Sequence, residues 1–315
     1  PMQKKMMLVG FVLIAILFVA GCSSAPGDSV QSTEAALEQA RTGTEGVKTS
    51  FLNNFPPPLI YDENELVTLL EIENKGGYTL QQEDCAVQIT GFDPSIIRGN
   101  FEASCGTNYG ELEGKNVYNL EGSINQIEFR SPSVRLPPGV FEYNPTLNVL
   151  TCYQYETHAN AEVCVDPSFY QITSEQKACT PRDVSLGGGQ AGPIGVSHVG
   201  VDMTGRKAVF EITVRNYQSG SRVLSPDVYV RDCGKGIFEF TDFDRIKYNV
   251  KLSGGGYLDC KPSDKYVRLH NGQGKIVCTY DIPGTVAFET PLQIDLQYGM
   301  MDSFSKQIKI IETPE

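Results

Sequence analysis

Apolar and polar residues alternate over many short stretches of this chain. Residues 70–74 (Leu-Glu-Ile-Glu-Asn) are one example, and residues 212–216 (Ile-Thr-Val-Arg-Asn) are another. A period of two places every second side chain on one face, as in a β-strand with one buried face. Helical signals are nearly absent apart from residues 32–41, where alanine and leucine favour a short helix. The pattern therefore predicts an all-β protein.

The two example stretches lie 142 positions apart and begin an internal repeat. Five further apolar positions recur 145 positions later, namely Leu147/Leu292, Val149/Ile294, Tyr153/Tyr298, Val163/Ile308 and Val165/Ile310. We interpret them as one antiparallel hairpin in each copy, with Tyr153 and Tyr298 packed in the core. The repeat predicts two tandem immunoglobulin-like β-sandwich domains, residues 51–174 and 175–315. Residues 23–50 form a polar linker that contains the short helix.

The first 22 residues resemble a secretory signal. Lys4 and Lys5 precede an apolar run that ends in Val19-Ala20-Gly21-Cys22, which is similar to a lipobox. In a lipobox the cysteine is lipidated, so Cys22 is the expected lipidation site and the protein is expected on the extracellular face of the membrane. The alternative is that residues 6–21 stay as an uncleaved anchor, although this run is shorter than the ~20 residues that a spanning helix needs.

The charge balance narrows the set of partners. The formal net charge is −12 at pH 7, and an acidic surface repels phosphate backbones and anionic lipid. We therefore expect no nucleic-acid partner and a membrane link only through the N-terminus.

The nine cysteines support an oxidising compartment, because eight remain for four disulfides once Cys22 is set aside. Cys152 and Cys164 sit symmetrically about the expected hairpin and change together to Gln297 and Lys309 in the second copy, so we pair them. Proximity pairs Cys85 with Cys105 and Cys260 with Cys278, and Cys179 with Cys233 then remains. The main competing pair is Cys164 with Cys179, and sequence alone does not decide the connectivity.

No catalytic or metal-binding motif stands out. His158 at the expected hairpin tip, His198 on a strand and His270 beside a turn have no ligand at metal-binding spacing. The acidic runs 62–65 and 242–244 could bind calcium, but solvated loops explain them better. The glycine-rich run 187–193 is interpreted as a loose connector. We expect a protein that is not an enzyme and has no cofactor.

Short motifs carry a family resemblance. Residues 43–47 (Gly-Thr-Glu-Gly-Val), the prolines at 56–57, residues 71–76 and residues 188–193 resemble uncharacterised secreted proteins of DPANN-type archaea. The strand followed by Asn74-Lys75-Gly76 also resembles adhesion-type β-sandwich modules of prokaryotic surface proteins. The second copy has Asn216-Tyr217-Gln218 at this turn. The resemblance implies a fold and a location and brings no functional residues.

The sequence thus favours a membrane-tethered structural or adhesive surface protein that binds protein partners or self-assembles, for example into a filament. Edge strands would accept a partner strand, and residues 292–310 and 66–74 are the expected edges. The alternative is a solute- or metal-binding lipoprotein of a transport system, and a third reading is an accessory subunit of a secreted enzyme.

Overall fold

The computed structural model describes residues 33–106, 110–171, 176–236 and 238–314, and in this part of the chain strands dominate. The one α-helix there is α2 (Thr33–Arg41), which confirms the helix expected at residues 32–41. Two short 3₁₀ turns, η1 (Val230–Asp232) and η2 (Phe240–Asp242), lie in the second half. The predicted all-β class is therefore confirmed.

The described strands form five sheets. The central sheet has the order β17 (Tyr266–Arg268), β15 (Arg245–Leu252), β19 (Phe288–Gln307), β10 (Thr146–Val165), β5 (Cys85–Thr90) and β6 (Glu102–Ser104), with β14 (Arg222–Leu224) also pairing with β19. A second sheet contains β1 (Val47–Phe51), β3 (Leu66–Asn74) and β8 (Ile124–Ser131). A third has the order β11 (Val184–Ser185), β12 (Ile194–Thr204), β13 (Lys207–Asn216), β18 (Gln273–Asp281) and β16 (Leu258–Lys261). Two small sheets contain β2 (Leu59–Tyr61), β20 (Lys309–Ile311) and β9 (Glu142–Tyr143), and β4 (Leu80–Gln81) and β7 (Glu111–Leu112).

Two unbroken strands of 20 residues each form the centre of the molecule. β10 and β19 pair antiparallel along their whole length, from Thr146 opposite Gln307 to Val165 opposite Phe288. The expected hairpins are therefore wrong, because each is one continuous strand. The repeat itself matches the topology: β3 and β13, which contain the two example stretches, are each the middle strand of a flanking sheet.

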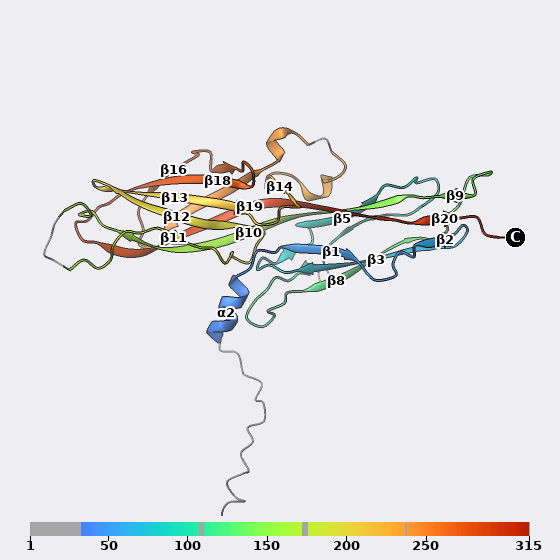
Figure 1. The fold of residues 1–315 in the computed structure, drawn as a ribbon, viewed down its shortest axis with the longest axis horizontal. Helices are drawn as coiled ribbons and strands as arrows, with labels where there is room; N and C mark the ends of the chain where they lie inside the picture. Colours follow the sequence, from blue (N-terminus) through green and yellow to red (C-terminus); the bar gives the residue numbers. More distant parts are fainter. Residues whose placement is uncertain (1–32, 107–109, 172–175, 237, 315) are drawn as a thin grey trace, which may run out of the picture.

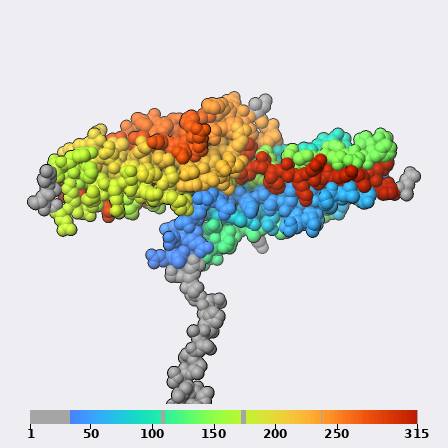
Figure 2. Space-filling view, in the orientation of Figure 1, coloured from blue at the N-terminus to red at the C-terminus, as the bar shows by residue number. Residues whose placement is uncertain are grey.

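Each of the two long strands extends from its own half of the chain into the part of the fold formed by the other half. Residues 148–153 of β10 pair with β5 of the first half, while the rest of β10 runs beside β11 and β12 of the second half (Figure 1). β19 pairs with β15 through residues 292–297, then passes into the first half and leads to β20, which pairs with β2 and β9. Figure 2 shows these C-terminal residues (dark red) against green and blue residues of the first half.

The buried side chains follow the two-residue period of the strands. Leu66, Leu70 and Ile72 of β3 are completely buried, and so are Tyr153 and Tyr298 of the two long strands, as expected for core positions. The largest cluster of buried apolar side chains draws residues from both halves. The expected domain boundary at residue 174 lies outside the described residues.

All eight cysteines in the described part of the chain form disulfides. Cys85–Cys105 and Cys260–Cys278 confirm two expected pairs. The other two are Cys152–Cys233 and Cys164–Cys179, so the expected pairs Cys152–Cys164 and Cys179–Cys233 are wrong and the competing pair was correct. Four disulfides fit an oxidising environment.

The wrong pairing of Cys152 with Cys164 follows from the wrongly expected hairpin between them. Cys152 and Cys164 lie 12 residues apart on one continuous strand, and at about 3.3 Å per residue this separates them by about 40 Å. A disulfide needs Cα atoms within about 7 Å. Cys152 instead meets Cys233 beside η1, in a small buried cluster with Leu224 and Val230.

Residues 1–32, with Cys22 and the expected signal or anchor, lie outside the described residues. Among the helices that are described, none is long and apolar enough to span a membrane.

We expect the Cys152–Cys233 bridge to stabilise the protein more than the Cys164–Cys179 bridge. The first closes a sequence separation of 81 residues and the second one of 15, so chain entropy alone gives about 4.5 and about 3 kcal/mol. The double variants C152A/C233A and C164A/C179A compared in urea unfolding test the order, and non-reducing peptide mapping tests the pairs. A Cys152–Cys164 peptide would contradict this connectivity.

Candidate functional site

The second half of β10 has a free edge. The β19 side is paired throughout, but β5 stops at Cys85, opposite Tyr153. The amide of Gln154 donates to Asp84 O (2.7 Å). By the period of two, the backbone groups of Glu156, His158 and Asn160 face the same side, and no described residue bonds to them there.

A groove of about 810 Å³ runs beside this edge. We call it the edge groove. Its walls are the C-terminal end of α2, residues 77–79, residues 115–117 and residues 185–191, and its β10 side is formed by Glu156, His158 and Asn160. An unpaired strand edge beside a hollow is the arrangement that accepts an added strand.

The glycine-rich run forms an ordered wall of this groove. Gly43 N donates to Gly188 O (3.1 Å), and the Gln190 side-chain amide donates to Leu186 O (3.2 Å) and Val196 O (3.1 Å). Gly189 has φ +72°, and an added Cβ there would lie 2.2 Å from Gly43 O, so the close approach of the two segments requires glycine. The run is therefore more than the loose connector expected from its composition.

Three tyrosines of the two long strands, Tyr153, Tyr155 and Tyr298, are buried in the core. Tyr155 donates its hydroxyl proton to Asn74 Oδ1 (3.1 Å) and accepts from the amide of Tyr78 (3.2 Å). The Tyr298 hydroxyl is 2.7 Å from Thr157 Oγ1 and accepts from Ile194 N (3.3 Å). Burial raises the pKa values of Tyr153, Tyr155 and Tyr298 well above the usual range, since a buried phenolate has lost its hydration.

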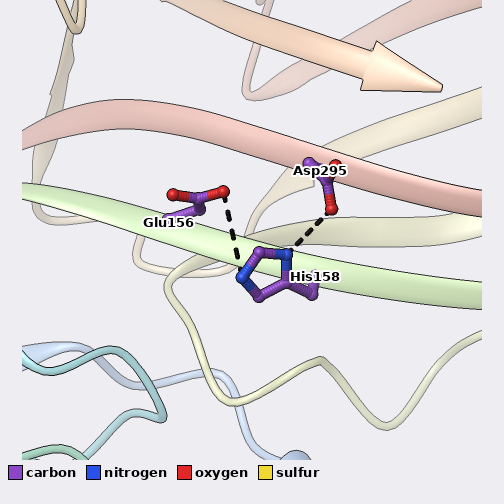
Figure 3. A group of neighbouring side chains, drawn as sticks. All are labelled: Glu156, His158 and Asp295. Carbon is purple, nitrogen blue, oxygen red and sulfur yellow. Dashed lines mark hydrogen bonds and ion pairs between the residues drawn. The ribbon is translucent and has the colours of Figure 1, made fainter.

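A histidine between two carboxylates lies on the outer face of the long strands (Figure 3). His158 Nδ1 is 2.8 Å from Asp295 Oδ1, and His158 Nε2 is 3.8 Å from Glu156 Oε1. The three ligand atoms lie within 4.8 Å of one another. His158 is exposed and also lines the edge groove.

Amides of neighbouring strands hold the outer oxygen of each carboxylate. Asn249 Nδ2 donates to Asp295 Oδ2 (3.2 Å), and Gln297 Nε2 donates to Glu156 Oε2 (3.4 Å). Each carboxylate is thereby left with one oxygen directed at the imidazole.

The sequence missed this cluster. Glu156 and His158 are two residues apart, so they share a face once the strand is known to continue. Asp295 is found only through the pairing register, which places it opposite His158. The expectation that His158 sits at a hairpin tip with no carboxylate neighbour is wrong.

The other candidate residues do not gather into a site. His198 Nε2 faces one carboxylate, Asp183 Oδ2, at 3.4 Å, and His270 is an exposed residue beside its turn. In the acidic runs, Asp62 accepts from Thr313 N (2.7 Å), Glu65 pairs with Arg130 (2.6 Å) and Asp242 caps Glu239 N (2.8 Å). Asp244 has φ +57° in a turn.

The expected acceptor edges are occupied over part of their length. β3 pairs with β8 through residues 66–73 and with β1 through residues 70–74, so residues 66–68 have a paired neighbour on one side. β19 pairs with β10 throughout, with β15 through residues 292–297 and with β14 through residues 299–301, so residues 302–307 have a paired neighbour on one side.

Comparison of this chain with known proteins does not assign it to a family. No protein-family model matches the chain, and no curated protein matches it. A solved structure of a protein of unknown function from Porphyromonas gingivalis W83 is similar over 75% of this chain and 84% of that one, at 12% identity and a TM-score of 0.17. A TM-score this low supports no conclusion about fold or function.

We expect stability to fall in alkali through the buried tyrosines. Unfolded tyrosines ionise near pH 10, whereas the buried ones stay neutral, so their contribution is complete below about pH 10 and is lost as pH rises toward their folded pKa values, by up to about 1.4 kcal/mol per pH unit each.

Tyr298→Phe tests this. It leaves the buried Thr157 hydroxyl without its partner, so we expect a loss of about 1–3 kcal/mol at neutral pH and a shallower fall in alkali. The control is Tyr118→Phe, because Tyr118 is 97% exposed. Equal alkaline slopes for wild type and Tyr298→Phe, by denaturant unfolding, would contradict the assignment.

The free edge predicts an alternating exchange pattern in the isolated protein. Amides of His158 and Asn160 face solvent, while those of Thr157 and Ala159 bond to β19, so we expect exchange rates to differ by roughly 100-fold or more. Hydrogen exchange followed by NMR measures this. Uniform protection from 156 to 160 would show that the edge is covered.

Proposed function

We propose that this protein is a membrane-tethered extracellular structural or adhesive protein, without enzymatic activity, that binds an extended segment of a partner protein at the free edge of β10. The observation that supports it best is the row of unpaired backbone groups at Glu156, His158 and Asn160 beside the edge groove. An added strand would take up these donors and acceptors, and the groove would receive its side chains.

The chemistry of the groove suggests what the partner segment carries. Leu37, Val117 and Leu186 line it, so an apolar side chain of the incoming strand would be buried there. The edge itself carries Glu156 and Glu162, which favours a basic side chain on the outer face. The segment we propose is an extended partner strand with apolar and basic residues in alternation.

The architecture suits a protein exposed outside the cell. Four disulfides and a core shared by both halves resist unfolding in an oxidising environment. The lipobox-like end at Cys22 supports attachment to the membrane, and the resemblance to archaeal surface proteins supports the location.

Assembly rather than solute transport is the better-supported role. Solute-binding lipoproteins usually hold their ligand between α/β lobes. The described residues contain strands and one short helix, with no such pair of lobes.

Asn160→Pro tests the proposal. Proline removes the amide that faces the free edge, and it leaves the bonds of Thr157 and Ala159 to β19 in place. In envelope extracts run on native gels, we expect wild-type full-length protein in a larger complex and Asn160→Pro largely as free protein.

Asn160→Thr is the matched control, because it keeps the amide and favours a strand. Thermal unfolding of both purified variants must show a retained fold. The proposal fails if Asn160→Pro stays in the complex, or if the wild-type protein migrates without any protein partner.

A further inference from the structure

We infer that Glu156 and His158 form a binding site for a divalent transition-metal ion such as Zn²⁺, with Asp295 positioning the imidazole. This site goes beyond the proposed strand binding and does not require it. The argument rests on the placement of three side chains on two paired strands and on the amides that hold them.

The pairing register fixes the arrangement. His158, Asp295 and Asn249 form one row across β10, β19 and β15, and Glu156 begins the next row on the same face. Strand side chains two residues apart point the same way, so Glu156 and His158 approach one another without any turn or strained backbone.

Asp295 determines which ring nitrogen is available. A carboxylate only accepts, so the 2.8 Å contact with Asp295 Oδ1 requires the proton on His158 Nδ1. The lone pair of neutral His158 then lies on Nε2, which faces Glu156. A carboxylate that fixes the tautomer in this way also makes the imidazole a stronger ligand.

The gap between Nε2 and Glu156 Oε1 suits a metal ion. The atoms are 3.8 Å apart, and Zn²⁺ takes nitrogen and oxygen ligands at about 2.0–2.2 Å each, so one ion fits between them with little movement. The imidazole favours a transition metal over calcium or magnesium, which prefer oxygen alone. The remaining positions of the ion are open to water on the exposed side.

Some of the surrounding residues favour binding of the ion, and one opposes it. The Gln297 amide at Glu156 Oε2 (3.4 Å) and the Asn249 amide at Asp295 Oδ2 (3.2 Å) fix both carboxylates. Lys247 lies across the sheet from Gln297, and its charge reduces the attraction for a cation. Two protein ligands and this lysine indicate a site of modest affinity.

The same chain offers an internal comparison. His198 Nε2 faces Asp183 Oδ2 at 3.4 Å, and no described carboxylate pairs with its other ring nitrogen. The described cysteines are all in disulfides, so their sulfur does not compete for the metal. The chain has three histidines, so only three imidazole NMR signals need to be assigned.

The test is a Zn²⁺ titration of the full chain followed by imidazole NMR. We expect saturable binding of one ion at His158 Nε2, before any change at His198 or His270. Glu156→Gln should weaken the binding strongly, Asp295→Asn by about 10-fold or more, and His198→Ala should leave it unchanged.

Each outcome decides the matter. Binding that survives in Glu156→Gln, or His198 responding at the same concentration as His158, would overturn the site. No response of His158 in the wild-type protein would do so as well. Because the readout is the histidine signal of the purified chain, failure here leaves the strand-binding proposal standing.

Discussion

The antiparallel pairing of β10 with β19 is the interaction on which the structure depends. Its 20 paired positions join β5 and β6 of the first half to β15 and β17 of the second half in one central sheet, and most of its buried side chains belong to the largest apolar cluster. It also creates both functional features. The free edge exists because β10 runs beyond the end of β5, and the histidine cluster exists because the register places Asp295 opposite His158.

The sequence predicted the elements better than their connections. Alternation identified β3 and β13, and equivalent spacing placed Tyr153 and Tyr298 in the core, because both follow from a local period. A period of two is the same in a hairpin and in a long strand, however. The absence of glycine and proline between Cys152 and Cys164 was the available sign that no turn occurs there.

The same limit explains the disulfides and the site. Nearby cysteines such as Cys260 and Cys278 were paired correctly, since adjacent strands bring them together. The pairs that depend on the hairpin failed with it. Asp295 lies 137 residues beyond His158, and only the register of two distant strands joins them.

The exchange of strand ends has a consequence for how the chain is made. A polypeptide is synthesised from its N-terminus, and the first half lacks its β20 partner for β2 and β9 until the last strands are complete. Until β20 is made, the edges of β2 and β9 that pair with it stay open, and open strand edges favour aggregation. The last residues of the chain are therefore the ones that complete the sheet begun by β2 and β9.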